Sequence, residues 1–163
     1  MLAEYAEKLL STFKKPLEVC FFVNSGSEAN DLALRLASRF TKGNEIIVLE
    51  NAYHGTTQSC VNISPTKHKG NHNYHNDIDC METPNFIHKI NAPDMIRGSK
   101  NSKDYSNQIK EKLKTIKNLS CFIVESVQGV GGQVFYPDNF LKESFDLVKE
   151  AGGICIADEG KND

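Results

Sequence analysis

The sequence lacks three features that would assign it to whole classes of protein. None of its apolar runs approaches the length of a membrane-spanning helix. Residues 1–13 are amphipathic and include acidic side chains, unlike a secretory signal or an arginine-rich transit peptide. No basic block is longer than a few residues, and 19 basic residues are balanced by 21 acidic ones. We therefore expect no membrane and no nucleic acid as partners.

The five cysteines include no Cys-x-x-Cys pair. Three of them, Cys20, Cys121 and Cys155, lie inside apolar, strand-like runs. We expect reduced cysteines that pack as small hydrophobic side chains. With 163 residues, the chain is long enough for one domain with a core, or for part of one.

Short apolar runs alternate with amphipathic segments along the chain. We expect helices over 3–13, 27–41, 105–117 and 138–151, and buried strands over 19–23, 45–49, 121–125 and 153–159. Continuous apolar strands are typical of parallel sheets, so the predicted fold is α/β, with a mostly parallel sheet and helices on both faces. Residues 62–104 show no reliable period, and we expect them to be mostly loop, functional or family-specific rather than filler.

The segment NSGSE, residues 24–28, connects the first predicted strand to the helix that follows. Ser25 with Glu28 three residues later is typical of a capping box, and Gly26 lets the turn bring its amides close to a ligand. The unpaired N–H groups at a helix start favour a phosphate. An ordinary strand-to-helix turn with a good cap is the alternative, and this segment alone does not decide between the two.

Polar side chains also follow the other predicted strands. Residues 50–55 follow the second strand, Glu125 ends the third, and Asp158 and Glu159 end the fourth. Ligands collect at the carboxyl ends of the strands in open parallel sheets, so we expect one rim that gathers these groups. Such a rim would offer a phosphate-binding turn, a ring able to stack on a flat heterocycle, and two carboxylates. These groups suit a phosphorylated aromatic cofactor, whose ring nitrogen a carboxylate would keep protonated.

Four motifs resemble those of the class III aminotransferases, pyridoxal-phosphate enzymes of fold type I. They are NSGSEANDLALRLA at 24–37, AYHGTT at 52–57, ESVQGVGGQ at 125–133 and AGGICIADE at 151–159, in the family's order. NDLALRLA and the ISP after the YHG segment are similar to the alanine-glyoxylate aminotransferase 2-like branch, which includes ethanolamine-phosphate phospho-lyase. The resemblance implies the fold type I transferase fold, with residues 1–163 as a central part of its large, cofactor-binding domain.

The resemblance also implies that the cofactor is pyridoxal 5'-phosphate and names the residues that bind it. The amides of Gly26 and Ser27 would hold the phosphate. Tyr53 would stack on the pyridine ring, with His54 beside it, and Asp158 would pair with the ring nitrogen. Of these assignments, the one for Asp158 has the strongest support from the motifs.

Each side chain also has a simpler interpretation. Glu125, which the resemblance implies as a catalytic residue that positions the site, could instead cap a neighbouring helix. Tyr53 could simply face the core, and His54 could be a loop histidine with satisfied hydrogen bonds. The joint occurrence of the four motifs favours the functional interpretation over these alternatives.

Three histidines, His68, His72 and His75, have a spacing that could suggest a metal site. They lie in a segment rich in glycine and asparagine, without a helix to align them. We therefore expect no metal.

The resemblance implies a lysine that binds the cofactor as a Schiff base, downstream of Asp158 and beyond residue 163. Lys161 cannot replace it, because a side chain three residues from Asp158 leaves the same strand tip. Residues 160–163 also depart from the family pattern, which continues with a branched apolar residue and glutamine. We expect a piece that lacks the N-terminal segment, the small domain and the catalytic-lysine region.

Three functions are compatible with these motifs. The first is a pyridoxal-phosphate-dependent transaminase that moves an amino group between an amino compound and a keto acid. The second is a phospho-lyase that acts on an amino-alcohol phosphate such as phosphoethanolamine, and the third is an inactive truncated product that associates with full-length subunits. The resemblance further implies a small-molecule amino substrate, a homodimer, and a mitochondrial or cytoplasmic location.

Overall fold

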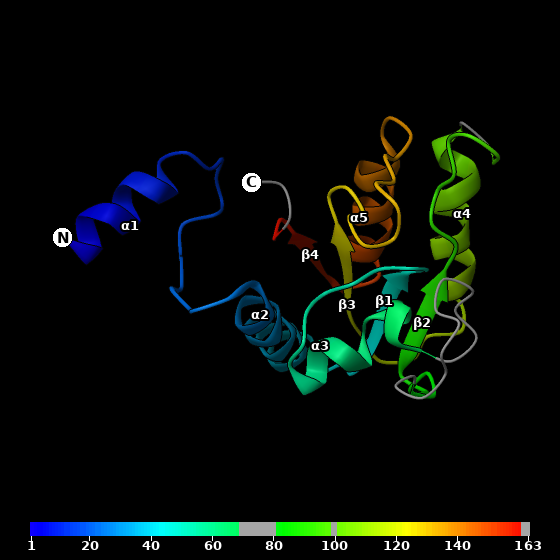
Figure 1. Cartoon of the computed structure of the whole chain (residues 1–163), viewed down its shortest axis with the longest axis horizontal. Helices are drawn as coiled ribbons and strands as arrows, with labels where there is room; N and C mark the ends of the chain where they lie inside the picture. The colour runs from blue at the N-terminus through cyan, green and yellow to red at the C-terminus, as the bar shows by residue number, and fades with distance from the viewer. Residues whose placement is uncertain (69–80, 99–100, 161–163) are drawn as a thin grey trace.

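A four-stranded parallel sheet forms the centre of the computed structural model, which describes residues 1–68, 81–98 and 101–160 (Figure 1). The strand order is β2-β1-β3-β4. The strands are β1 Glu45–Leu49, β2 Ile87–Ile90, β3 Leu119–Glu125 and β4 Ile154–Asp158. The predicted α/β fold with a parallel sheet is confirmed.

Helices cover both faces of the sheet. The helices of the described chain are α1 Leu2–Leu10, α2 Gly26–Thr41, α3 Gln58–Asn62, α4 Ser102–Leu113 and α5 Phe140–Glu150, with a short 3-10 turn, η1, at Pro65–Lys67. In Figure 1, α4 and α5 lie side by side on one face, and α2 lies on the other. Among the described residues, no helix has the length and apolar character that crossing a bilayer requires.

The core divides into two clusters because successive strand residues point to opposite faces of the sheet. Ile47 and Leu49 of β1 pack with Phe122 and Val124 of β3 against α4 and α5. The alternate residues of the same strands point to the other face and pack with Leu34 and Ala37 of α2. They are Ile46, Val48, Cys121 and Ile123. Both faces of β1 and β3 are therefore buried, which explains why these strands read as continuous apolar runs.

The start of α2 is fixed by side-chain caps. The Ser25 hydroxyl accepts a hydrogen bond of 3.2 Å from the Glu28 amide. The Glu28 carboxylate reaches back and accepts a 2.8 Å bond from the Asn24 amide, one residue before the cap position. The capping predicted from Ser25 and Glu28 is present, with this shift of one residue in the second bond.

The strand predicted over 19–23 is wrong. No strand among the described residues pairs with this segment, and its side chains are largely exposed, with Val19 at 76% and Phe21 at 62%. The segment and α1 lie apart from the sheet, whose described edges are β2 and β4 (Figure 1). Phe22 contacts Tyr5 of α1, with ring centroids 5.6 Å apart. An apolar run forms a strand only beside another strand, and none of the described strands reaches this segment.

The prediction that residues 62–104 are mostly loop is right for much of its described part, but it missed β2. Ile87 and Ile90 of β2 are buried, and the two residues between them, His88 and Lys89, obscure the apolar pattern. Among the cysteines, Cys60 and Cys121 are buried, Cys20 and Cys155 are half-buried, and all four have free thiols. Cys80, His72 and His75 lie outside the described residues.

Candidate cofactor site

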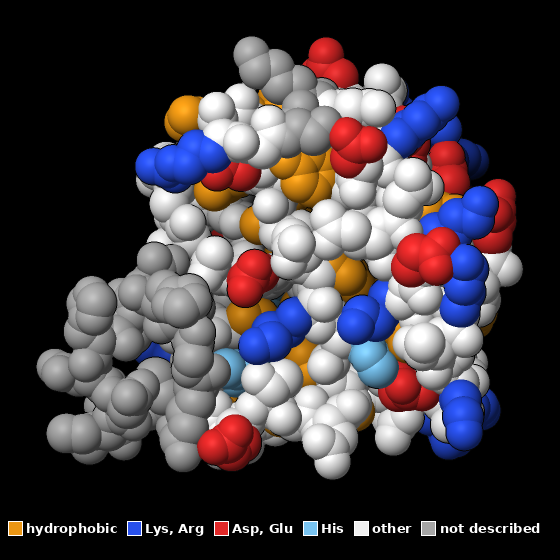
Figure 2. Space-filling model, turned by 90° about the vertical axis from the view of Figure 1, so that its right-hand side faces the viewer, with side chains coloured by type: hydrophobic (Ala, Val, Ile, Leu, Met, Phe, Trp, Pro, Cys, Tyr) orange, Lys and Arg blue, Asp and Glu red, His pale blue; other side chains and the backbone are white. Residues whose placement is uncertain are grey.

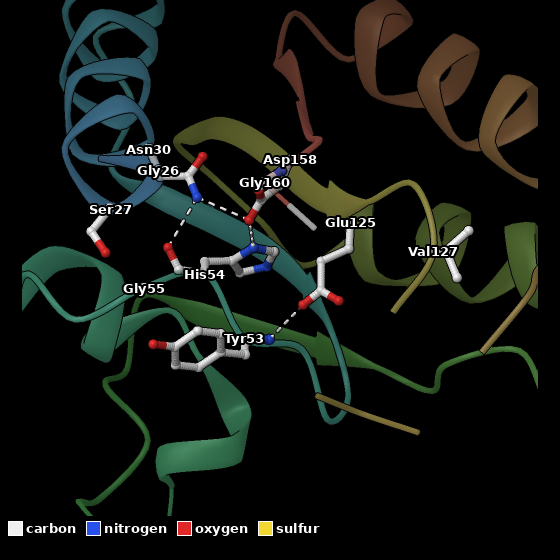
Figure 3. Close-up of a pocket in the computed structure, with 10 residues that line it drawn as sticks. All are labelled: Gly26, Ser27, Asn30, Tyr53, His54, Gly55, Glu125, Val127, Asp158 and Gly160. Atoms are coloured by element: carbon white, nitrogen blue, oxygen red, sulfur yellow. Dashed lines mark hydrogen bonds and ion pairs between the residues drawn. The ribbon is translucent and has the colours of Figure 1, made fainter. Parts of the chain in front are cut away.

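A pocket of about 180 Å³ opens where β3 and β4 end, beside the first turn of α2 and the loop that follows β1 (Figure 3). All six residues that the sequence indicates for the site line this pocket: Gly26, Ser27, Tyr53, His54, Glu125 and Asp158. Sequence reasoning missed four others: Asn30, Gly55, Val127 and Gly160. The described structure thus brings together residues from all four motifs.

The first turn of α2 forms one end of the pocket. The first amides of a helix have no acceptor within the helix and carry the positive end of its dipole, so they are suited to an anion. A Cβ atom at Gly26 would meet nothing within 4 Å, which means that the space beside this amide is open. The Ser27 hydroxyl is held in place, because it accepts a 3.0 Å hydrogen bond from the Thr56 amide.

Gly55 allows the loop after β1 to approach α2 this closely. Its φ is +123°, which side chains rarely adopt, and a Cβ there would lie 2.9 Å from the Cβ of Ser27. The AYHGTT motif therefore requires glycine at this position, for a reason that is visible only in the packing against α2.

The Asp158 carboxylate lines the pocket at the tip of β4 and is held by three donors. Its Oδ2 accepts hydrogen bonds from His54 Nδ1 at 2.8 Å and from Asn30 Nδ2 at 2.9 Å. Its Oδ1 accepts a 3.0 Å bond from the Gly160 amide. Burial by itself raises the pKa of Asp158, but the hydrogen bonds from His54, Gly160 and Asn30 outweigh it, so the pKa lies below its usual value.

His54 lies against Asp158 with its side chain fully buried. Because Asp158 Oδ2 is an acceptor, Nδ1 carries a proton, and Nε2 is buried without a hydrogen-bond partner in the described chain. The His54 amide donates a 2.9 Å bond to the buried Ser64 hydroxyl, which anchors the loop below the pocket.

Glu125 is a buried carboxylate at the end of β3, 4% exposed. Its Oε1 accepts a 2.9 Å hydrogen bond from the Tyr53 amide, and its Oε2 accepts a 2.8 Å bond from the Gly129 amide. It therefore binds two loop amides and does not cap a helix. One consequence is that Glu125 fixes the backbone from which the Tyr53 side chain projects.

These residues fit a phosphorylated aromatic ring. An anion can bind beside the first turn of α2, and a protonated ring nitrogen can pair with the ionised Asp158 in the same pocket. The open space at Gly26 and the buried, unpartnered Nε2 of His54 leave room and hydrogen-bonding capacity for a ligand.

Metal ligands are not gathered in the described part of the chain. His68, the one described member of the predicted histidine group, is buried and hydrogen-bonded through Nε2 to the Asn62 carbonyl at 3.0 Å. Burial lowers the pKa of His68, and this favours the neutral ring.

The fold and the pocket together define an α/β domain with its polar groups at the carboxyl ends of parallel strands, where such domains bind ligands. The chain belongs to the aminotransferase class-III family, which it matches over residues 1–161. The family resemblance indicated by the four motifs is thus confirmed.

Curated relatives include alanine-glyoxylate aminotransferase 2 proteins and a phospho-lyase homologue, the members of the branch that the motifs indicate. The chain is 39% identical over 171 residues to alanine-glyoxylate aminotransferase 2-like of Drosophila melanogaster, covering 97% of this chain and 33% of the relative. It is 38% identical over 185 residues to the human protein named alanine-glyoxylate aminotransferase 2, mitochondrial, covering 96% and 34%. It is 34% identical over 177 residues to ethanolamine-phosphate phospho-lyase homolog 1 of Caenorhabditis elegans, covering 97% and 36%. The chain spans about a third of the length of these curated relatives.

Solved structures with the same fold include both kinds of enzyme. A phospholyase from Arthrobacter, in complex with phosphoethanolamine, has a TM-score of 0.80 and 27% identity, covering 96% of this chain and 37% of that one. An amine transaminase from an uncultivated Pseudomonas species, in its PLP-bound form, has a TM-score of 0.76 and 22% identity, covering 97% and 38%. At this identity, the second comparison shows the fold alone.

Proposed function

We propose that this chain binds pyridoxal 5'-phosphate in the pocket between α2 and β4. We further propose that the protein it represents transfers an amino group between an amino compound and a keto acid. The observation that carries the proposal is that Gly26 and Ser27, at the start of α2, line the same pocket as the ionised Asp158, at the tip of β4. Family membership supports the choice of cofactor.

Each pocket residue has a defined task in this proposal. The amides of Gly26 and Ser27 bind the phosphate, and the open space at Gly26 accommodates it. The Tyr53 ring stacks on the pyridine ring, and Asp158 holds the ring nitrogen protonated. When bound, pyridoxal phosphate supplies an electron-withdrawing ring that stabilises negative charge at the substrate carbon. Glu125 holds the main chain of Tyr53 in place by accepting a hydrogen bond from the Tyr53 amide.

No lysine lines the pocket in the described residues, and Lys161 is not among those residues. The contacts proposed here are therefore all noncovalent. We propose that the lysine required for the complete reaction lies downstream of Asp158, as the family resemblance implies. We propose that the chain is a central part of the large cofactor-binding domain. From the family resemblance, we also propose that the assembled enzyme is a homodimer and that it works in the mitochondrion or the cytoplasm.

Binding can be tested with deoxypyridoxine phosphate, in which a methyl group replaces the aldehyde, so that no lysine is needed. We expect calorimetric titration of the chain to show binding of this ligand and little binding of pyridoxine, which lacks the phosphate. Asp158→Asn should weaken binding, whereas the control Asp104→Asn, an exposed position on α4, should not. Equal binding of the two ligands, or equal behaviour of the two variants, would contradict the proposal.

A phospho-lyase is the second candidate, supported by the 27% identity to the Arthrobacter phospholyase and by the nematode relative. Phosphoethanolamine with one water would give acetaldehyde, ammonia and inorganic phosphate in equal amounts, without a keto acid. Assays of the protein purified from its natural source would distinguish the two reactions. Amine transfer that requires a keto acid and releases no phosphate identifies the transaminase, and phosphate release without a keto acid identifies the lyase.

The third candidate is a chain that is inactive by itself and associates with full-length subunits. The absence of lysine among the described pocket-lining residues favours this possibility for the isolated 163-residue chain. Borohydride reduction of the chain with pyridoxal phosphate should then label no unique lysine, and transaminase assays should give background rates. Robust turnover by the purified chain would rule this candidate out.

A further inference from the structure

Asn30 is a buried polar side chain on an otherwise apolar face of α2. It is 7% exposed, and the other buried residues of this helix are Leu34 and Ala37. Asparagine is unfavourable inside a helix because its side chain competes for backbone hydrogen bonds. Its presence on this face therefore calls for an explanation from its contacts.

The Asn30 amide nitrogen donates two hydrogen bonds, both of 2.9 Å (Figure 3). One goes to Asp158 Oδ2, and the other goes to the main-chain carbonyl oxygen of His54. Both partners are acceptors, which fixes the orientation of the amide: its NH₂ group, not its oxygen, faces them. A single side chain thereby joins α2, the loop after β1 and the tip of β4.

Two consequences follow for the carboxylate. With Asn30 and His54 on Oδ2 and Gly160 on Oδ1, donors on both oxygens fix the rotation of the Asp158 side chain. The second bond of Asn30, to the His54 carbonyl, holds the loop that carries both His54 and Tyr53 at a constant distance from Asp158. Loss of Asn30 would remove one hydrogen bond from the carboxylate and one from this loop at the same time, leaving the bonds from His54 and Gly160 to Asp158.

We propose that Asn30 is a positioning residue that aims the Asp158 carboxylate at the ring nitrogen of the cofactor and couples it to the loop carrying Tyr53. The inference rests on the proposed function, in which the ring nitrogen faces Asp158. Asn30 exchanges no proton and acts on the ring through Asp158.

Two variants test this role. Asn30→Leu keeps the approximate volume and removes both donors, and Asn30→Asp puts a second carboxylate against Asp158. Since hydrogen bonds to charged groups are typically worth about 1.5–3 kcal/mol, we expect deoxypyridoxine phosphate to bind about 10- to 100-fold more weakly to both variants at neutral pH. Nitrogen NMR of the labelled ligand should show the ring protonated in the wild-type complex and less protonated in the Asn30→Leu complex.

The pH dependence separates positioning from simple packing. In acid, the carboxyl group introduced by Asn30→Asp becomes protonated and can donate to Asp158, so this variant should recover part of its affinity, whereas Asn30→Leu should not. Asn107→Leu, at an exposed position on α4, is the matched control and should bind like the wild type. Wild-type affinity in both Asn30 variants and unchanged ring protonation in Asn30→Leu would overturn the proposal, provided that circular dichroism shows them folded.

A measurement without ligand makes the two proposals separable. Carbon NMR of the labelled Asp158 carboxyl should show a higher pKa in folded Asn30→Leu than in the wild type, because one donor to the carboxylate is lost. If the wild-type chain does not bind deoxypyridoxine phosphate, the proposed function fails and this titration still tests Asn30. An unchanged pKa of Asp158 would then overturn the positioning role.

Discussion

Replacing Gly55 by alanine should crowd Ser27 in the first turn of α2, where we propose that the phosphate binds; Figure 3 shows both residues beside the pocket. Gly55 has φ of +123°, and an added Cβ would lie 2.9 Å from the Ser27 Cβ and 3.0 Å from the Ser27 Cα. These atoms belong to the first turn of α2, so the crowding cannot be relieved by rotating a flexible side chain. Either α2 or the loop after β1 must shift, and the bond from the Thr56 amide to the Ser27 hydroxyl is weakened in both cases.

Two terms set the expected loss of stability. A side chain held in a sparsely populated backbone region costs about 1–3 kcal/mol. Crowding a well-packed site costs a further amount of about 1–3 kcal/mol. Their sum, about 2–6 kcal/mol, is a large part of the roughly 5–15 kcal/mol that typically stabilises a domain. We therefore expect Gly55→Ala to lower the free energy of unfolding by about 2–6 kcal/mol.

Urea unfolding of the chain, followed by circular dichroism, measures this loss. Gly152→Ala is the matched control, because Gly152 has φ of +81° and a Cβ there would meet nothing within 4 Å. The control should lose only the backbone term, about 1–3 kcal/mol. If the two variants lose equal stability, the contact with Ser27 contributes nothing, and the steric explanation for Gly55 is refuted.

Three further predictions address the same site. Gly26→Ala should change the free energy of unfolding by less than about 1 kcal/mol, because a Cβ there meets nothing within 4 Å. Calorimetry should nevertheless show at least about tenfold weaker binding of deoxypyridoxine phosphate, because the added methyl group occupies the space proposed for the phosphate. Ser25→Ala should lower the free energy of unfolding by about 1 kcal/mol in urea through loss of the bond to the Glu28 amide, and an unchanged midpoint would contradict the cap. Hydrogen bonds hold the pKa of Asp158 in the folded chain below its usual value, so ionised Asp158 stabilises the fold at any pH above that usual value. This stabilisation is lost as the pH falls through the pKa of the folded state. Asp158→Asn should therefore lose less stability than the wild type on acidification from about pH 5 to about pH 2, and parallel curves would contradict the assignment.

Local signals in the sequence are sufficient to predict α2 and the two central strands of the sheet, β1 and β3. The Ser25 cap and the apolar stripe through Leu34 and Ala37 are readable within one segment, so the start of the helix is predictable to within a residue. Strands β1 and β3 are buried on both faces, and their continuous apolar runs make them recognisable. In these elements, the residues that determine the structure are neighbours in the chain.

The failures concern interactions between distant segments. The run at 19–23 has the composition of a strand, but strand formation depends on a neighbour that local sequence cannot specify. Strand β2 escapes prediction for the opposite reason: it pairs with β1, although His88 and Lys89 interrupt its apolar pattern. Pairing, and not propensity, determines the outcome in both segments.

The pocket could be predicted because parallel strands place their carboxyl ends at one edge, whatever their separation in the chain. His54 and Asp158 are 104 positions apart and are nevertheless joined by a 2.8 Å bond. Asn30 leaves a weaker signal, a polar residue on an apolar helix stripe, which could be noticed but identifies no partner. Figure 2 shows that the surface on the side of β2 and α4 carries charged side chains of both signs.

Two of the residues that the sequence could not assign, Gly55 and Asn30, share a physical property: each contacts and constrains another residue of the pocket. Gly55 matters through the space it leaves for Ser27, and Asn30 matters through the oxygen it holds on Asp158. Such roles depend on close contacts between distant segments, whereas groups that would touch a ligand are recognisable by their chemistry alone. If this is correct, changes at Asn30 should alter the protonation of the bound ring without removing any group that contacts it. Changes at Asp158 itself should remove the contact, so the Asn30 and Asp158 variants should differ in the ring-nitrogen NMR signal even where their affinities are equal.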